Sequence, residues 1–516
     1  MTSESLHRAV EDFLAGAGNA VVLENGVAAF DLAEARYSIS GEYNKCLLHL
    51  WSADRSVVRR VLSIEAKRDV LRLEVQCLGQ TWPTKLEICR ERDRRTPTAK
   101  KITRSTYQSK LQRMLERQYP GHVVGRLSSS IDLERSFGPI YARGLLRQGQ
   151  SAVAVMGVNA DETQSFIDAC LTFGILWLDA CRQHHAGKLV VSGLKLFLPP
   201  GTSAMVQNRM GHLDHGLARF ELYEVDEQQM TLEQVDWNDC GNIATRLVHT
   251  TDEAAARARF HEEISYVKSL YARVEVAVLN PAEVAFRCLG LEFARARLFH
   301  EPGTASSTPQ LVFGLGCGET VFDHTSADRF RALVYSIAEV RHADGPRDHL
   351  LWRMHPERWL ESLTLQCVNA VDEHLDSDSV YSQVPAFSAA DRAMIDVLSV
   401  TREGRLAVIE LKADEDLHLP LQGVDYWLRV SWHHRQGEFK SFGYFPTREL
   451  SPQPPLLYLV APALHIHPAT DTILRYLSPA IPWSLVGIDE RWRSGVRPVF
   501  RKRPGSSGSS AATADR

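Results

Sequence analysis

The chain has 516 residues, more than one hydrophobic core ordinarily holds, so several domains are expected. A hydrophobic fraction of 44% and a charged fraction of 24% are typical of soluble globular proteins, and no apolar run is long enough to span a membrane. The formal net charge of −4 excludes a uniformly basic polyanion binder, so any affinity for nucleic acid would have to come from local basic patches. An N-terminus without the basic flank and apolar core of a signal peptide predicts a cytoplasmic protein.

The nine cysteines are odd in number, scattered along the chain, and contain no CxxC pair. A disulfide framework or a zinc site would need cysteines at paired, recurring spacings. Buried free thiols are therefore the expectation.

The first 202 residues alternate between helical and β-rich stretches. Residues 1–36 are expected to form an N-terminal helix and a lead-in, and residues 37–202 an α/β domain. The elements predicted here are a helix over 6–16, a β meander over 37–89, a helix around 107–118, strands near 142–158, a helix near 161–182 and a strand over 188–199.

Residues 203–345 continue as an α/β connecting region in which the sequence indicates no chemistry. Its predicted elements are a strand over 218–225, a helix over 252–273, strands over 274–279, 283–290 and 310–316, and a helix over 326–341. A polar linker, residues 342–349, leads into a final domain over 346–500, and the low-complexity residues 501–516 are expected to be disordered. The final domain should begin with the helix PERWLESLTL and a loop, followed by a hairpin and a helix near residue 416.

Three charged residues interrupt the apolar strands of this hairpin. The strands MIDVLSV and RLAVIELK are joined at TREG, so that Asp396 lies in the first strand and Glu410 and Lys412 in the second. Residues two apart in a strand point to the same face, and pairing around the Glu403–Gly404 turn brings Asp396 across from Glu410. Burying three charges in a sheet costs several kcal/mol, which favours a functional role over a charged pair that is merely solvated on an exposed hairpin.

The chemistry of such a site follows from its charges. Two adjacent carboxylates raise one another's pKa unless a cation lies between them, and hard oxygen ligands favour Mg²⁺ or Mn²⁺. The metal could polarise a phosphoryl oxygen and lower the pKa of a bound water, while Lys412 could orient that water or stabilise developing negative charge. The three residues therefore outline the hydrolysis of a phosphodiester.

The segment IDVLSVTREGRLAVIELK, residues 395–412, resembles the core hairpin of the PD-(D/E)XK nuclease superfamily, especially of NucS-type endonucleases and RecB-type nuclease domains. Downstream, QGVDY is similar to the QxxxY helix motif of RecB-type domains, and upstream a glutamate falls where the family often has one on a helix. The resemblance implies an α/β fold with a restriction-endonuclease-like mixed sheet flanked by helices. The catalytic residues that it implies are Asp396, Glu410, Lys412, Gln422, Tyr426 and Glu361. It also implies hydrolysis of DNA with Mg²⁺ or Mn²⁺ held by Asp396, Glu410 and the carbonyl of Leu411.

The sequence departs from the family pattern on both sides of the hairpin. Ile395 stands where proline is common, and the acidic residues 414–416 follow Lys412 where NucS-type enzymes are often basic. These acids could cap the following helix, since carboxylates favour a helix N-terminus, or one of them could be an additional metal ligand. Upstream, Glu357 is a rival to Glu361 for the role of the helix glutamate.

A second segment, residues 142–162, aligns without gaps with residues 395–415. In this register the three catalytic positions carry Arg143, Gly157 and Asn159, and a metal could not bind to them. We interpret the segment as a nuclease-like copy that has lost its catalytic residues. The alternative is a chance match between two βαβ units.

The stretch from Arg90 to Arg117 contains ten Lys and Arg against three acids, a density suited to phosphate contacts. Its alternative interpretation is a solvated loop and helix face. The residues expected to bind nucleic acid are Arg94, Arg95, Lys100, Lys101 and Arg104. By contrast, His465 and His467 lack a matching carboxylate or cysteine pattern, so no metal site is expected there.

The sequence thus predicts a deoxyribonuclease whose final domain is a metal-dependent endonuclease, with N-terminal regions that bind substrate or mediate assembly. DNA is the expected partner, a membrane is not, and a homodimer is one assembly open to such an enzyme. The alternatives are a non-catalytic DNA-binding or scaffold protein and a nuclease that acts on RNA. The presence of Asp396, Glu410, Lys412 and Gln422 together argues against the first of these.

Overall fold

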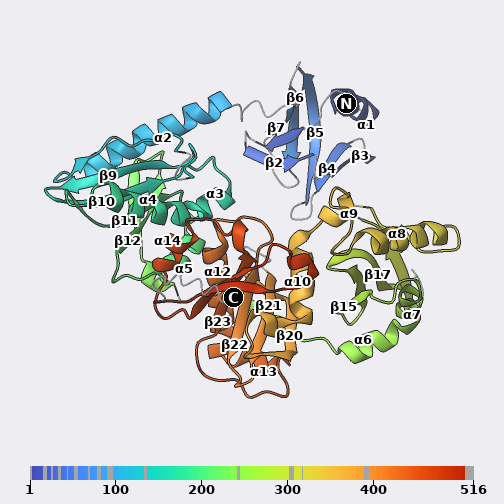
Figure 1. Ribbon diagram of the computed structural model, residues 1–516. Coiled ribbons are helices and arrows are strands. Elements are labelled where there is room, and N and C mark those ends of the chain that lie inside the picture. Colours follow the sequence, from blue (N-terminus) through green and yellow to red (C-terminus); the bar gives the residue numbers. More distant parts are fainter. Residues whose placement is uncertain are drawn as a thin grey trace. The chain divides into compact units, whose positions relative to one another are not determined.

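The computed structural model of the protein describes residues 3–14, 20–24, 27–32, 36–42, 45–51, 56–67, 70–77, 83–89, 97–132, 136–240, 245–300, 307–315, 318–388 and 394–505. The chain is an α/β protein that divides into two compact units, Met1–Tyr107 and Gln108–Arg516 (Figure 1). No helix in the described ranges combines the length and the apolar character that crossing a lipid bilayer requires.

The first unit is an antiparallel sheet with one helix packed against it. Apolar residues of α1 (Ser3–Leu14) recur at helical spacing, as Leu6, Val10 and Phe13, and contribute to the buried core of the sheet. The strands pair in the order β2-β1-β7-β6-β5-β4-β3. Their bounds are β1 (Val21–Glu24), β2 (Val27–Asp31), β3 (Arg36–Glu42), β4 (Lys45–Trp51), β5 (Ser56–Ala66), β6 (Val70–Cys77) and β7 (Thr84–Cys89). The meander predicted over 37–89 is therefore present. A helix, α2 (Pro97–Gln118), contains the boundary between the two units.

The second unit begins with a mixed sheet in the order β13-β12-β11-β10-β9-β8, which we call the first layer. Its three inner strands, β10, β11 and β12, run parallel, and β9 and β13 pair antiparallel on either side of them. Two helices lie between β10 and β11, and one lies between β11 and β12. The bounds are β8 (Val123–Val124), β9 (Ala142–Gln148), β10 (Ser151–Gly157), α3 (Gln164–Asp168), α4 (Cys170–His184), β11 (Val190–Leu198), α5 (Ala204–Met210), β12 (Arg219–Asp226) and β13 (Thr231–Val235).

A smaller antiparallel sheet with its own core follows, in the order β15-β16-β17-β18-β19. The single helix predicted over 252–273 is two helices, because Phe260 leaves the helical conformation and its ring is fully buried in that core. The strand β17 has no counterpart among the predicted strands. The bounds are α6 (Glu253–Arg259), α7 (His261–Leu270), β15 (Glu275–Asn280), β16 (Glu283–Cys288), β17 (Leu291–His300), β18 (Ser307–Phe313), β19 (Thr320–Val321) and α8 (Ala327–Val340).

The C-terminal sheet, in the order β14-β20-β21-β22-β23-β24-β25, is the second layer. Here β22, β23 and β24 run parallel, and β21 and β25 pair antiparallel on either side of them. The bounds are β14 (Thr245–Leu247), α9 (Leu350–Arg353), α10 (Pro356–Gln366), α11 (Val368–Val371), β20 (Leu375–Ser388), β21 (Met394–Thr401), β22 (Leu406–Leu411), α12 (Leu419–Arg435), α13 (Glu438–Ser441), β23 (Leu456–Pro462), α14 (Thr470–Arg475), β24 (Trp483–Ile488) and β25 (Pro498–Lys502).

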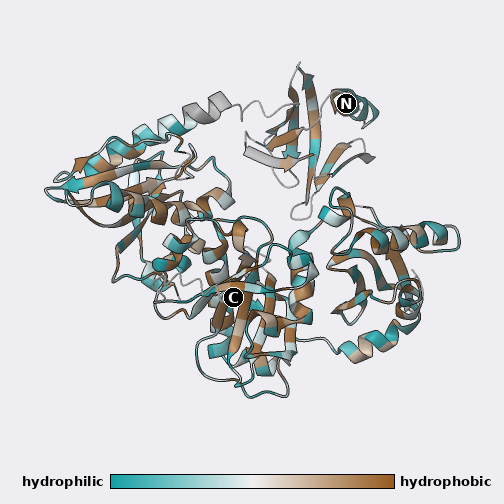
Figure 2. Cartoon of the chain, viewed as in Figure 1, coloured by the Kyte–Doolittle hydropathy of each residue, from teal (hydrophilic) through white to brown (hydrophobic). Residues whose placement is uncertain are grey.

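Both faces of the second layer are covered, so its inner strands are mostly apolar, as the brown strands of Figure 2 show, with Glu410 in β22 as a charged exception. Leu406 and Val408 point to the face that α12 covers, whereas Ala407 and Ile409 point to the face that α10 covers. The α12 face shares one hydrophobic core with the α4 face of the first layer. The two layers therefore pack helix side to helix side.

The structure differs from the predicted organisation at three places. The first sheet continues past residue 202, because β11 and β12 are parallel neighbours. The loop predicted between α10 and the hairpin is mostly the long strand β20, which pairs with β21. Arg501 and Lys502, predicted to belong to a disordered tail, are part of β25 and pair with β24, and residues 506–516 of that predicted tail lie outside the described residues.

Candidate functional site

The predicted hairpin consists of β21 and β22, and its turn fixes the register of the site. Gly404 has a φ of +84°, and a Cβ there would collide with the carbonyl oxygen of Glu449, so that only glycine fits this turn. From the turn, Val397 pairs with Ile409, which places the preceding Asp396 beside Glu410. The two carboxyl groups are close enough that the negative charge of Asp396 raises the pKa of Glu410.

Backbone hydrogen bonds hold the three predicted residues at the end of this hairpin. The N–H of Leu411 donates to Asp396 Oδ2 at 3.1 Å, and the N–H of Lys412 donates to the carbonyl of Val460 in β23 at 3.0 Å. Lys412 Nζ lies 3.4 Å from Glu410 Oε1. The structure therefore brings Asp396, Glu410 and Lys412 together, as their spacing predicted.

Burial dominates the electrostatics of the site. The Glu410 side chain is 2% exposed, and burial together with the negative charge of Asp396 raises the pKa of Glu410 well above its usual value. Burial also raises the pKa of Asp396. Burial alone would lower the pKa of Lys412, but the charges of Glu410, Glu357 and other nearby acids outweigh it and raise that pKa.

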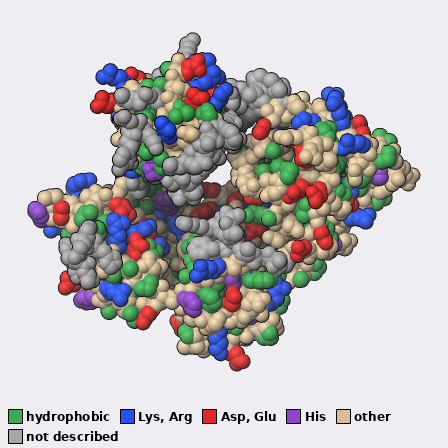
Figure 3. Space-filling model, turned by 180° about the vertical axis from the view of Figure 1, so that it is seen from behind, with side chains coloured by type: hydrophobic (Ala, Val, Ile, Leu, Met, Phe, Trp, Pro, Cys, Tyr) green, Lys and Arg blue, Asp and Glu red, His purple; other side chains and the backbone are tan. Residues whose placement is uncertain are grey.

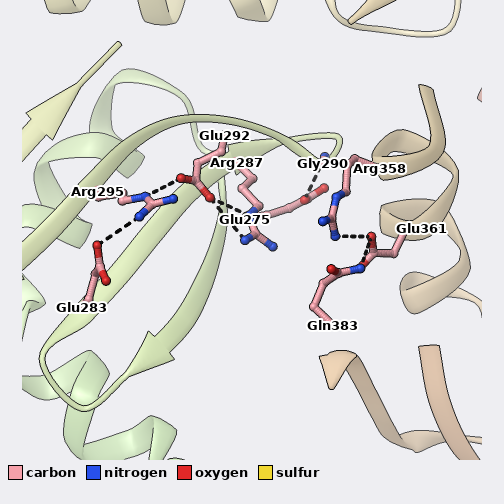
Figure 4. A network of polar contacts seen from close by, with 9 residues as sticks. All are labelled: Glu275, Glu283, Arg287, Gly290, Glu292, Arg295, Arg358, Glu361 and Gln383. Carbon is pink, nitrogen blue, oxygen red and sulfur yellow. Dashed lines mark hydrogen bonds and ion pairs between the residues drawn. The ribbon is translucent and has the colours of Figure 1, made fainter. Parts of the chain in front are cut away.

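Both candidate glutamates of α10 lie near the hairpin. Glu357 Oε1 is 3.7 Å from Lys412 Nζ. Glu361 is 5% exposed and accepts hydrogen bonds from Arg358 and Gln383, each at 3.0 Å (Figure 4). Burial, reinforced by the charge of Asp396, raises the pKa of Glu361. The structure thus places Glu357 beside Lys412 and pairs Glu361 with Arg358 and Gln383, and the role of each stays a prediction.

Polar contacts also join the smaller sheet to α10, near Glu275 and Gly290 of Figure 4. The N–H of Gly290 donates to Glu275, and Ser362 of α10 donates to the same carboxylate. A Cβ at Gly290 would collide with the carbonyl of Arg358, so the two elements are in direct contact there. Sequence reasoning missed Arg358 and Gln383 as partners of Glu361; the only available signal was the three-residue spacing of Arg358 and Glu361 on one helix.

The QxxxY motif lies on α12, which covers the carboxylate face of the hairpin. Gln422 and Tyr426 are one helical turn apart and so share a side of the helix. Burial and the negative charges of Glu410 and Asp396 raise the pKa of the Tyr426 hydroxyl, which places that hydroxyl near both carboxylates. Gln422 Oε1 is buried and has no hydrogen-bond partner among the described residues.

Each of the three acids that follow Lys412 has a partner: Asp416 meets a backbone N–H near the start of α12, and the other two lie near histidines. Asp416 Oδ1 accepts the backbone N–H of His418 at 2.7 Å, just ahead of the first turn of α12. His465 lies 4.0 Å from Asp414, and His467 lies 3.7 Å from Glu415. These two histidines therefore lie near carboxylates that their sequence spacing does not indicate.

The donor set of the hairpin fits a hard divalent cation. Glu410 Oε2 is buried and, among the residues that the structure describes, has no hydrogen-bond partner, which would cost free energy unless another group bound it. No three His, Cys, Asp or Glu side chains of the described chain gather closely enough to hold a metal by themselves. A cation here would therefore have Asp396 and Glu410 as side-chain ligands, with the Leu411 carbonyl and water as the others.

The first layer repeats the second without its polar residues. Ala154 and Met156 of β10 pair with two leucines of β11 against which Gly174 of α4 lies. Val408 and Glu410 of β22 pair in the same way with two leucines of β23 against which a glycine of α12 lies. Met156, rather than the predicted Gly157, is thus the counterpart of Glu410.

This correction extends to the rest of the repeat. Arg143 pairs with Met156, so it remains the counterpart of Asp396. The residue that matches Lys412 is Val158 and not the predicted Asn159, and both Met156 and Val158 are fully buried. The gap-free alignment is wrong by one residue in the second strand, but the conclusion that this copy has no carboxylate pair is unchanged.

The region expected to bind nucleic acid is only partly described. Arg94 and Arg95 lie outside the described residues, whereas Lys100, Lys101 and Arg104 belong to α2. Further along α2, Lys110 lies 3.3 Å from Glu227, so part of the basic run is engaged in an ion pair. On the face drawn in Figure 3, the described basic and acidic side chains are interspersed.

Comparisons with known proteins add little. The sequence matches no protein-family model and no curated protein. Among solved structures, the crystal structure of a repair endonuclease from Pyrococcus abyssi is similar with a TM-score of 0.16 and 10% sequence identity, over 44% of this chain and 96% of that chain. A TM-score and an identity this low do not define a shared arrangement, so the functional assignment depends on the residues of the site.

Proposed function

We propose that the protein is a metal-dependent nuclease that hydrolyses phosphodiester bonds of DNA at the second layer. One observation carries the proposal: the buried carboxyl group of Glu410 and the half-buried carboxyl group of Asp396 meet beside Lys412, and Glu410 Oε2 has no partner in the described chain. Buried like charges are costly, and proteins retain them chiefly at functional sites.

The residues of the site would have different roles in hydrolysis. Asp396, Glu410 and the Leu411 carbonyl would hold Mg²⁺ or Mn²⁺, which when bound supplies a polarised phosphoryl oxygen and a water of lowered pKa. Lys412 is kept charged by the acids around it and can hold that water or the developing negative charge by hydrogen bonding. Tyr426 and Gln422 cover the same face from α12 and can donate to the substrate or to the carboxylates.

The test is cleavage of single- and double-stranded DNA, with RNA as the comparison, by purified protein in Mg²⁺ or Mn²⁺. Asp396→Asn and Glu410→Gln should each lower turnover on the order of 10³-fold or more and weaken Mn²⁺ binding. Lys412→Ala should lower turnover similarly but leave Mn²⁺ binding nearly intact. Full activity in Glu410→Gln would refute the assignment, and preferential cleavage of RNA would replace DNA as the substrate.

Substrate binding would draw on α2 and its preceding segment, because acids 414–416 surround the site with negative charge. Each phosphate neutralised should add roughly 0.9 to the slope of log affinity against log salt. Replacing Lys100, Lys101 and Arg104 by Gln should lower this slope by about two to three in catalytically inactive protein, with little change in sequence preference. Superimposable salt titrations of this variant and its parent would show that the basic run is only solvated surface.

A further inference from the structure

The first layer contacts the second through a pair of reciprocal ion pairs. From the first layer, Arg209 of α5 reaches Asp425 of α12; from the second layer, Arg475 of α14 reaches Asp179 of α4. Each arginine is the sixth residue of its helix, and α5 and α14 follow equivalent strands of the repeat. The interface between the layers is therefore nearly two-fold symmetric.

Backbone contacts at the centre of this interface agree with that symmetry. Leu213, just after α5, and Leu477, just after α14, form an antiparallel bridge. Its two hydrogen bonds run in opposite directions: Asp214 N–H donates to Tyr476 O at 2.8 Å, and Ser478 N–H donates to His212 O at 2.9 Å. The two layers thus associate as two subunits of a dimer would, within one chain.

The reciprocal ion pairs differ in burial and in what lies beside them. The Arg209 side chain is 7% exposed and holds Asp425 through two nitrogens, Nε at 3.0 Å and Nη2 at 2.7 Å, while its Nη1 donates to the Asp168 carbonyl at 2.8 Å. Arg475 is 59% exposed and contacts Asp179 by one nitrogen at 3.3 Å. Asp425 directly precedes Tyr426, whereas Asp179 lies on the helix of the layer without a carboxylate pair.

The first layer also holds α12 at other points. Thr172 Oγ1 of α4 lies 3.2 Å from His418 Nδ1, at the N-terminus of α12, and the Phe173 ring meets the same imidazole edge to face. Farther along, His212 meets the indole of Trp427 edge to face. The first layer therefore contacts α12 along more than two turns, on a side that adjoins the one carrying Gln422 and Tyr426.

We propose that Arg209 is a positioning residue: the catalytically empty layer uses it to hold α12 so that Gln422 and Tyr426 face Asp396 and Glu410. The inference rests on the proposed nuclease function insofar as it concerns turnover. A planar, bidentate guanidinium fixes both the distance and the direction of its partner, which an ammonium does not. Arg209→Lys should therefore keep the charge balance but release α12, and a small displacement of groups at a reacting centre lowers the rate by about 10- to 100-fold.

The decisive experiment compares the same substitution at three arginines. Arg209→Lys should lower kcat by about 10-fold or more with little change in KM or Mn²⁺ affinity. Arg475→Lys, at the symmetry-related position, and Arg143→Lys, at a position of the first layer that is 4% exposed, should each leave kcat within about twofold once corrected for the folded fraction. The double variant Arg209→Asp with Asp425→Arg exchanges the two partners of the ion pair. It should recover part of the kcat that Arg209→Lys loses.

Hydrogen exchange tests the positioning role of Arg209 independently of the nuclease proposal. Backbone amides of residues 419–435 should exchange faster in Arg209→Lys than in wild type or in the two control variants, whether or not the protein cleaves DNA. Absence of cleavage by wild type would refute the nuclease function while the exchange pattern still decides the positioning role. Unchanged exchange in α12, or an equal loss of kcat in Arg143→Lys, would overturn the positioning role.

Discussion

The two layers have the same order and direction of their inner strands but opposite chemistry at equivalent positions. Where the second layer has Glu410 the first has Met156, which is fully buried and pairs with Arg143. Arg143 donates to the Gly138 carbonyl and stacks 4.5 Å over the ring of Phe137. The difference shows that the fold does not require the carboxylates. They are retained at an energetic cost in one layer only, which is the pattern expected of a functional site.

The comparison predicts the product of cleavage, and here the expected effect is all-or-none. If the first layer occupies the place of a second subunit and has no carboxylate pair, each chain holds one catalytic centre and cuts one strand. Supercoiled plasmid should then convert to nicked circles before any linear form accumulates, on a gel sampled through the reaction. Linear DNA appearing together with the first nicked circles would indicate paired active sites, for example in a homodimer, and an exclusive preference for single-stranded DNA would limit the prediction to that substrate.

Substitutions at the counterpart residues Arg143 and Asp396 should have opposite effects on stability and on turnover. Arg143→Met should destabilise the protein by about 2–4 kcal/mol, because it removes a buried cation and leaves backbone carbonyls without their donors. Turnover per folded molecule should not change. Asp396→Asn should abolish turnover and change stability by less than about 1 kcal/mol. Denaturant titrations and cleavage assays on the same preparations would check both; a loss of turnover in fully folded Arg143→Met would contradict the comparison.

Removing the charge of Glu410 should stabilise the metal-free protein. Folding raises the pKa of Glu410, so its contribution to stability is fully present below the unfolded pKa and is lost as pH rises through the folded one. Glutamine does not ionise, and Glu410→Gln should therefore gain on the order of 1–2 kcal/mol at neutral pH in EDTA, with the gain shrinking toward acid pH. Added Mg²⁺ should stabilise the wild type more than the variant. A gain that does not depend on pH would mean that Glu410 is not the titrating group.

The hairpin and the meeting of its three charged residues could be predicted from the sequence because both depend on local patterning. Alternation in an apolar strand and a two-residue spacing place Glu410 and Lys412 on one face without any knowledge of the rest of the chain. The long strand β20 was missed because its sequence, LDSDSVYSQVPAFS, is polar at many positions and includes a proline, which argues against an inner strand.

The register predicted for the first layer was wrong for a different reason. Four residues separate the paired Arg147 and Ala152, whereas five separate the equivalent Val400 and Leu406. An alignment without gaps does not detect a turn that is one residue shorter, and a one-residue slip reverses every side chain of the second strand. The contact of Arg209 with Asp425 spans 216 residues, and no local pattern indicates it.

The smallest effects are expected at the two helix glycines that approach the central strands. A Cβ at Gly174 of α4 would lie 2.8 Å from Leu196 Cδ2, and a Cβ at Gly423 of α12 would overlap the equivalent Cδ2 of Leu459. Alanine gains about 1 kcal/mol in helix propensity over glycine, but crowding a packed core costs about 1–3 kcal/mol, so each Gly→Ala change should destabilise by about 1 kcal/mol net.

Their effects on turnover should differ, because Gly423 is adjacent to Gln422 and lies on the helix that carries Tyr426, whereas α4 carries none of the proposed catalytic residues. Gly423→Ala should push α12 outward from β23 and lower kcat several-fold, while Gly174→Ala should leave it unchanged. Thermal unfolding of both variants beside their cleavage rates would check this. An unchanged kcat in Gly423→Ala would show that the site tolerates this displacement of α12 relative to β22, and an equal loss of kcat in Gly174→Ala would show that the effect is not specific to α12.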